Sequence, residues 1–248
     1  MKTIAMIPAR YDASRFPGKL MKHIAGKPVI TRTFLATLNT GLFDEVFVVT
    51  DNDEIGNEIK SVGGNVLFSK KKHNSGSDRI AEVSKRIDCD IIVNVQGDEP
   101  FTEKKSLKKL IDVFKKDSIH KISLASLMVP INNNSEYNNP NCVKVVTDKN
   151  NFALYFSRSS IPHHRSLKSP AIVFKHKGVY AFRKSALLEF TSLPTSNLEL
   201  SEKIECLRFL ENGRRIKMVE TDIQGIEIDT PADLAKANMI WCSKARSS

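Results

Sequence analysis

Short apolar runs alternate with amphipathic helical patterns through the first half of the chain. The apolar runs cover residues 3–7, 45–50 and 90–95. They are short and rich in β-branched residues, which is typical of strands that are buried on both faces. Between and after them, helical patterns cover residues 29–38, 53–62, 78–87 and 104–114. This order predicts βαβ units and a mostly parallel sheet, which is an α/β fold.

The middle of the chain has a different pattern. Four strand-like runs without long helices between them cover residues 121–129, 142–146, 152–156 and 172–182. Asparagine-rich turns separate these runs. We therefore expect a β-rich part at about residues 121–183, within a single domain that spans residues 1–248.

The last part of the chain returns to helices. We expect a helix over residues 199–210, a strand over residues 216–220 and a final helix. Thr230 and Pro231 are the residue types preferred at the N-cap and at the first position of such a helix.

The charge balance favours a polyanionic partner. The chain has 38 basic and 28 acidic residues, so its formal net charge is +10. Nucleic acid, an acidic membrane surface and a phosphorylated small molecule all fit this charge. The basic residues are scattered, however, and aromatic residues do not interleave with them as a nucleic-acid stacking platform needs. We therefore expect no nucleic-acid partner.

The composition and the apolar runs exclude several classes of protein. Hydrophobic residues make up 41% and charged residues 27%, so extensive disorder is excluded. No apolar run approaches the roughly 20 residues of a membrane span. The apolar stretch near the start is too short for a signal peptide. We expect a cytoplasmic protein that does not insert into membranes.

The cysteines and histidines show no metal or redox motif. The four cysteines are far apart, and the six histidines lack the H-E-x-x-H spacing. We expect all four thiols to be reduced.

A basic loop follows the first predicted strand. Arg10, Arg15 and Lys19 place three cations in it, and Gly18 allows a close approach of the backbone. Loops at the carboxyl ends of parallel strands line the ligand crevice of open α/β sheets. A triphosphate needs such cations and backbone donors. The P-loop and G-x-G-x-x-G motifs are both missing. The alternative to a phosphate site is a solvated basic turn.

Two aspartates lie in loops where they are suited to bind a cation. Asp98 follows the third predicted strand, and Asp229 precedes the final helix. Mg²⁺ prefers one or two carboxylates together with phosphate oxygens. The alternative for each aspartate is a capping role at a helix start.

Two further groups of polar residues are candidates for recognition. Residues 73–79 suit a base-recognition loop or a helix N-terminus that takes a phosphate, or else an ordinary capped helix start. Arg158, His176, Tyr180 and Glu205 have side chains that recognise sugar acids, although a lone histidine in a strand is more often structural.

In this order, the motifs resemble those of the 3-deoxy-manno-octulosonate (Kdo) cytidylyltransferases, also called CMP-Kdo synthetases. The resemblance extends from about Thr3 to Ala237. The motifs that support it are residues 7–11, 15–19, 26–28, 75–79, 93–100, 141–148, 155–158, 176–180 and 229–231.

The resemblance implies a Rossmann-like nucleotide-diphospho-sugar transferase fold with an inserted antiparallel β region for homodimerisation. It also implies that the chain transfers CMP from CTP to Kdo with Mg²⁺ as cofactor, releases pyrophosphate and serves lipopolysaccharide biosynthesis.

The same resemblance assigns roles to residues. Lys19, Asp98 and Asp229 are implied to be catalytic, and the two aspartates are implied to share the metal. The implied nucleotide-binding residues are Arg10, Ser14, Lys19, Ser75, Arg79 and Gln96. The implied sugar-binding residues are Gln96, Arg158, His176, Tyr180 and Glu205.

One departure from the family pattern leaves the sugar open. Cys206 replaces a glutamine that is usual beside Glu205. The 8-amino-3,8-dideoxy analogue of Kdo and other sugar acids therefore remain alternatives.

Two other hypotheses about the function explain fewer of these residues. A nucleic-acid-binding protein leaves the loop carboxylates unexplained, and a catalytically dead regulator does not explain the presence of Lys19, Asp98 and Asp229.

Overall fold

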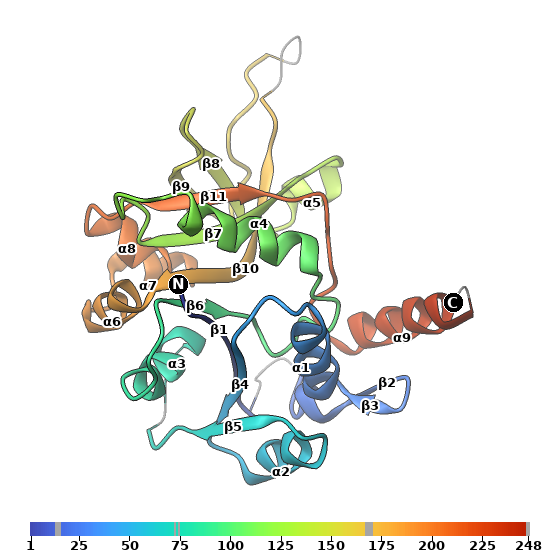
Figure 1. Ribbon diagram of the computed structural model, residues 1–248. Coiled ribbons are helices and arrows are strands. Elements are labelled where there is room, and N and C mark those ends of the chain that lie inside the picture. Colours follow the sequence, from blue (N-terminus) through green and yellow to red (C-terminus); the bar gives the residue numbers. More distant parts are fainter. Residues whose placement is uncertain (13–15, 72, 74, 167–170, 247–248) are drawn as a thin grey trace. The chain divides into compact units, whose positions relative to one another are not determined.

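The chain divides into two compact units in a computed structural model. The structure describes residues 1–12, 16–71, 73, 75–166 and 171–246. Unit 1 comprises Met1–Leu107 and Gly225–Ser248, and unit 2 comprises Lys108–Gln224 (Figure 1). The predicted β-rich part, residues 121–183, belongs to unit 2.

Unit 1 contains a parallel sheet. Its strands follow the order β6 (Ile91–Asn94), β1 (Thr3–Ala9), β4 (Glu45–Thr50) and β5 (Asn65–Phe68). Every neighbouring pair in this order is parallel. All residues of β1 and β6 are buried, as the apolar runs predict for strands that are covered on both faces. The predicted βαβ arrangement is confirmed.

The helices of unit 1 match the predicted periodic segments closely. Figure 1 shows α1 and α3 on opposite sides of β1 and β4. Thr230 caps the final helix, because its Oγ1 accepts a hydrogen bond from the backbone N–H of Asp233. The helices are η1 (Lys19–Met21), α1 (Val29–Asn39), α2 (Asp53–Ser61), α3 (Gly76–Ser84) and α9 (Pro231–Arg246). A small hairpin of β2 (His23–Ile24) and β3 (Lys27–Pro28) accompanies them. Helix α4 (Lys104–Lys115) begins in unit 1 and continues into unit 2.

Unit 2 is rich in antiparallel strands, as predicted. Strand β7 pairs antiparallel with β10 and parallel with β11, while β8 pairs antiparallel with both β9 and β10. The strands are β7 (Leu124–Pro130), β8 (Lys144–Thr147), β9 (Ala153–Ser157), β10 (Phe174–Arg183) and β11 (Ile216–Glu220). The helices are α5 (Asn134–Asn138), α6 (Lys184–Ser192), α7 (Asn197–Glu202) and α8 (Leu207–Glu211).

The prediction of one helix over residues 199–210 is wrong. The segment forms two short helices, because Lys203 has the left-handed conformation with φ of 55° and ends α7. Arg208 then donates two hydrogen bonds, of 2.6 and 2.7 Å, to the carboxylate of Glu199. Nine residues of straight helix would separate these two by about 13 Å along the axis. The break at Lys203 therefore allows the buried ion pair to form.

The structure also describes the cysteines and the hydropathy of the helices. All four cysteines are free thiols, as predicted. Within the described residues, the helices lack the combination of length and hydropathy that a membrane span requires.

Candidate functional site

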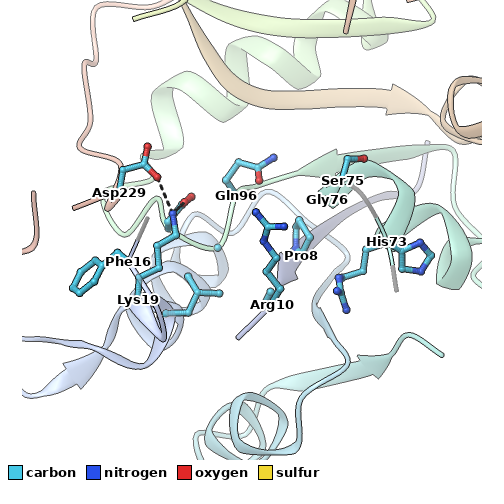
Figure 2. Close-up of a pocket in the computed structure, with 14 residues that line it drawn as sticks. Pro8, Arg10, Phe16, Lys19, His73, Ser75, Gly76, Gln96 and Asp229 are labelled. Atoms are coloured by element: carbon cyan, nitrogen blue, oxygen red, sulfur yellow. Dashed lines mark hydrogen bonds and ion pairs between the residues drawn. The ribbon is translucent and has the colours of Figure 1, made fainter. Parts of the chain in front are cut away.

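A pocket of about 200 Å³ opens in unit 1, where the loops after β1 and β6 meet the start of α3. Figure 2 shows Lys19 and Asp229 towards one end of this pocket and His73, Ser75 and Gly76 towards the other. The lining residues are Pro8, Ala9, Arg10, Phe16, Lys19, Leu20, His73, Ser75, Gly76, Arg79, Gln96, Gly97, Asp98 and Asp229. The carboxyl ends of the parallel strands therefore form the crevice that the sequence predicts.

The loop after β1 brings two of its predicted cations to the pocket. Arg10 directly follows β1, and Lys19 begins η1. Gly18 precedes Lys19 with φ of 65°, a left-handed conformation that favours glycine. Its N–H donates to the carbonyl of Tyr11 over 3.3 Å, which folds the loop back. The predicted phosphate contacts Ser14 and Arg15 lie outside the described residues.

Lys19 joins the two predicted carboxylates. Its Nζ lies 2.5 Å from Asp98 Oδ2 and 2.9 Å from Asp229 Oδ1. All three side chains are largely shielded from solvent, with 15, 22 and 29% exposed for Lys19, Asp98 and Asp229. Burial lowers the pKa of Lys19, but the charges and hydrogen bonds of the two carboxylates outweigh burial and raise it. Lys19 is therefore a firmly charged ammonium.

The backbone holds Asp229 in this position. The N–H of Ile228 donates to the carbonyl of Asp98 over 3.0 Å, so the two loops are joined next to the carboxylates. Asp233 supplies the carboxylate that accepts from the N–H and hydroxyl groups of Thr230 at the start of α9. The carboxylate of Asp229 points instead to Lys19.

The two carboxylates fit a hard divalent cation. Since both accept from one nitrogen, their oxygens converge on a single position. Across the part of the chain that the structure describes, no cluster of three or more His, Cys, Asp or Glu side chains suited to a metal occurs. Two carboxylates are nonetheless the donor set that Mg²⁺ uses when phosphate oxygens complete its shell. Lys19 has to leave this position before a cation can share both carboxylates.

At the opposite end of the pocket, two glycines lie where a larger side chain would contact Pro8. Ser75 is the N-cap of α3, because its hydroxyl accepts from the N–H of Asp78 over 3.1 Å. A Cβ added to Gly76 would lie 2.9 Å from Pro8 Cγ and 3.5 Å from Gln96 Oε1. A Cβ on Gly97 would lie 3.0 Å from the carbonyl oxygen of Pro8. Side chains at either glycine would therefore crowd Pro8.

Two basic side chains near this end are held by carboxylates. Arg79, predicted to help place a nucleotide, is 4% exposed and pairs with Asp51. His73 Nε2 lies 2.6 Å from Glu82 Oε2. Sequence reasoning assigned no role to His73, Asp51 or Glu82. His73 belongs to a segment that was singled out, whereas Asp51 and Glu82 emerge only from the tertiary contacts.

Gln96 lines the pocket between its two ends (Figure 2). Its Nε2 donates to Asn94 Oδ1 over 3.4 Å, a long hydrogen bond. The predicted nucleotide-binding residues of the described chain therefore share one pocket in unit 1.

Two of the predicted sugar-binding residues meet in unit 2. The ring centroids of His176 and Tyr180 are 5.4 Å apart, and Phe156 lies 4.9 Å from His176 on another side. The hydroxyl of Ser126 lies 2.9 Å from His176 Nε2. Burial lowers the pKa of His176 to about 4, so the ring is neutral near pH 7. Tyr180 also hydrogen-bonds with Cys206, whose pKa is raised by burial.

Arg158, another predicted sugar-binding residue, contacts backbone in unit 2. Its Nε donates to the carbonyl of Glu202 over 2.6 Å, and its Nη1 donates to that of Pro140 over 2.9 Å. Glu205 lies between α7 and α8, next to buried Cys206. The sugar-binding roles of both residues stay predictions.

Comparisons with known proteins agree on one family. A family model described as cytidylyltransferase matches residues 4–216. A 3-deoxy-manno-octulosonate cytidylyltransferase of Christiangramia forsetii is 56% identical over 239 residues, which is 96% of each chain. Its counterpart in Flavobacterium johnsoniae is 59% identical over 237 residues, covering 96% of this chain and 97% of that protein.

Solved structures give the same result. The structure of a CMP:2-keto-3-deoxy-manno-octonic acid synthetase complexed with CTP superposes with a TM-score of 0.93 at 35% identity. It covers 98% of this chain and all of that one. A 4-diphosphocytidyl-2C-methyl-D-erythritol synthase from Anaerococcus prevotii shares the fold, with a TM-score of 0.64 at 17% identity. On this sequence identity and coverage, the chain belongs to the 3-deoxy-manno-octulosonate cytidylyltransferase family.

Proposed function

We propose that this chain transfers CMP from CTP to the anomeric hydroxyl of Kdo and releases pyrophosphate. The observation that best supports this function is the convergence of Lys19, Asp98 and Asp229 at one end of the pocket. A cation and two carboxylates at that point suit the transfer of a phosphoryl group, which depends mainly on positioning and charge neutralisation.

The nucleotide occupies the pocket of unit 1 in this proposal. Its triphosphate lies at the end with Lys19, and Arg10, which lies between the two ends (Figure 2), adds a second positive charge. Its base lies towards Ser75 and Gly76, at the opposite end. Charge grows on the leaving pyrophosphate, and Lys19 and Arg10 neutralise it.

Asp98 and Asp229 would hold Mg²⁺ after Lys19 has moved to the phosphates. Bound there, Mg²⁺ would neutralise phosphate charge and lower the pKa of the attacking hydroxyl. Lys19 thus exchanges one set of anionic partners for another. Its ammonium balances the carboxylates before substrate binds and the triphosphate afterwards.

Residues of unit 2 recognise the sugar acid in this proposal. Neutral His176 accepts or donates one hydrogen bond, and Tyr180 adds a hydroxyl. Arg158 and Glu205 supply groups for the carboxylate and the hydroxyls of the sugar. The buried contact between Tyr180 and Cys206 is the reason to test the 8-amino analogue as a second acceptor.

We also propose that the chain forms a homodimer through the β-rich part of unit 2. Leu154 and Ile172 support this, because they are 62% and 70% exposed although both are large and apolar. Light scattering at several protein concentrations tests the proposal, and a monomer at all of them would contradict it.

The function is tested by measuring pyrophosphate release. CTP is compared with ATP, GTP and UTP, with Kdo and its 8-amino analogue as separate acceptors and Mg²⁺ present. We expect release with CTP and Kdo only, or with CTP and both acceptors if the sugar pocket is tolerant. Release with another nucleotide but none with CTP would contradict the proposal.

A further inference from the structure

The guanidinium of Arg79 contacts two residues that directly follow strands, Asp51 after β4 and Ser69 after β5. Its Nη1 lies 2.9 Å from Asp51 Oδ1, and its Nη2 lies 3.0 Å from Asp51 Oδ2. The Nη2 contact is a hydrogen bond and the Nη1 contact is an ion pair, so each carboxylate oxygen of Asp51 lies close to one terminal nitrogen of the guanidinium. Nη1 also donates to the hydroxyl of Ser69 over 2.7 Å.

The sheet fixes both partners of Arg79. Thr50 of β4 and Phe68 of β5 are in register, so Asp51 and Ser69 leave the sheet at the same level. The N–H of Ser69 donates to the carbonyl of Thr50 over 2.9 Å and extends this pairing by one residue. The guanidinium is thus anchored to the paired ends of β4 and β5.

Among the described residues, these two hydrogen bonds and one ion pair involve only Nη1 and Nη2 of the guanidinium. A guanidinium has five N–H groups. Asp51 faces the edge formed by Nη1 and Nη2, and Nη1 donates to Ser69. The Nε–H and one Nη2–H belong to the other edge, where they form a parallel pair of donors.

Arg79 belongs to the end of the pocket that our proposal gives to the base. Arg79 lines the pocket, and its backbone N–H donates to the carbonyl of Ser75 in the first turn of α3. Ser75 lies towards the end opposite Lys19 and Asp229 (Figure 2). A parallel pair of donors matches cytosine, because N3 and O2 of cytosine are adjacent acceptors. Uracil instead presents N3–H, a donor, beside O2.

We propose that Asp51 and Ser69 are positioning residues for base selection. By occupying one edge of the Arg79 guanidinium, they fix the other edge so that it accepts cytosine and rejects uracil. The inference rests on the proposed function, in which CTP occupies this pocket. Neither Asp51 nor Ser69 lines the pocket, so both act through Arg79.

The test is to measure CTP and UTP binding by calorimetry in wild type and in Asp51→Asn. Asparagine offers an N–H₂ group where the carboxylate offered its second oxygen, so the guanidinium has to turn. We expect the preference for CTP over UTP to fall about tenfold, mainly through weaker CTP binding. The KM for the sugar acid stays at the wild-type value. Ser69→Ala is the milder variant, with an expected two- to threefold fall in the same ratio.

Asp117→Asn is the matched control. Asp117 Oδ2 pairs with Arg183 Nη2 over 3.0 Å in unit 2, and both side chains are largely buried. This variant loses a comparable ion pair, and we expect it to keep the wild-type ratio. A wild-type ratio in both Asp51→Asn and Ser69→Ala would overturn the role of these residues, and so would an equal fall in Asp117→Asn. A wild type without preference for CTP would instead contradict the proposed function.

Discussion

The candidate residues of the two units lie in contrasting surroundings. In unit 1, they line one pocket, and the ion pairs of Lys19 with Asp98 and Asp229 lie at its wall. In unit 2, His176 and Tyr180 are 9% and 5% exposed and pack against other aromatic rings. Unit 1 presents charged groups that a ligand can displace or join. In unit 2, the His176 and Tyr180 side chains contribute to the packing of the fold itself.

The difference follows from the two kinds of strand arrangement. The strands of unit 1 run parallel, so their carboxyl ends and the polar loops after them gather at one edge. The candidate residues of β10 lie within an antiparallel strand, so their side chains join the packing of the sheet. Variants in unit 1 are therefore expected to change activity with little effect on stability, and variants in unit 2 to change stability as well.

The largest effect on activity is expected for Asp98→Asn. Loss of one carboxylate at the charged end should lower kcat at least ~100-fold, the scale of removing a major electrostatic contact. Steady-state kinetics measures this. The control is Asp112→Asn, because Asp112 pairs with Lys108 on the surface of α4. A kcat for Asp98→Asn near the wild-type value would exclude a catalytic role for this carboxylate.

A pH effect on stability is expected from His176 in unit 2. Burial lowers its folded-state pKa to about 4, whereas an unfolded histidine titrates near 6.5. The unfolded state therefore binds more protons below pH 6.5, and stability is lost as the pH falls from 6.5 towards 4.

This loss amounts to about 1.4 kcal/mol per pH unit at most, or about 2 kcal/mol between pH 6.5 and 5. Urea unfolding across this range measures it. His176→Asn should flatten the dependence, while exposed His120→Asn should leave it unchanged. An equal pH dependence in wild type and His176→Asn would show that this histidine is not buried as a neutral ring.

Lys19→Met tests the two proposed roles of Lys19, which are to bind a phosphate of CTP and to pair with the two carboxylates before substrate binds. Loss of the ammonium should raise the KM for CTP about tenfold, since one phosphate contact is lost. It should also tighten the binding of Mn²⁺ without nucleotide, because the ammonium no longer competes for Asp98 and Asp229. Exposed Lys22→Met is the control. An effect of Lys19→Met on the sugar KM alone would contradict both roles.

The smallest effect is expected for Gly76→Ala. The new Cβ would lie 2.9 Å from Pro8 Cγ and 3.5 Å from Gln96 Oε1 at the base end of the pocket. CTP binding should weaken about threefold, as expected when a snug pocket is overfilled. Alanine is the better helix former at this position in α3 and offsets part of the crowding against Pro8, so the melting temperature should fall only slightly. A clearly lower melting temperature with unchanged CTP binding would show that the new Cβ disturbs the fold and not the nucleotide pocket.

The sequence predicts most of the fold because strand and helix patterns are strong in this chain. The βαβ order of unit 1 and the β-rich part of unit 2 both follow from local periodicity. The helix over residues 199–210 is the instructive error. The pair of Glu199 with Arg208 and the left-handed Lys203 are tertiary and backbone features that apolar spacing does not report.

The site is predictable to the extent that it depends on strand ends. Asp98 and the loop with Lys19 follow buried strands, and Asp229 meets Asp98 at the ammonium of Lys19. That both carboxylates serve one ion stays a prediction. Asp51 and Ser69 escape sequence reasoning because their contact with Arg79 depends on the register between β4 and β5. The contacts of Arg158 with backbone carbonyls are equally invisible in sequence spacing.

The most direct measurement of the central claim is Mn²⁺ binding by electron paramagnetic resonance, with CTP present and the sugar acid absent. If Asp98 and Asp229 jointly hold a divalent cation beside the nucleotide, wild type should bind the ion with CTP. Asp98→Asn and Asp229→Asn should each weaken it at least about tenfold. Wild-type Mn²⁺ affinity in both variants would contradict the claim.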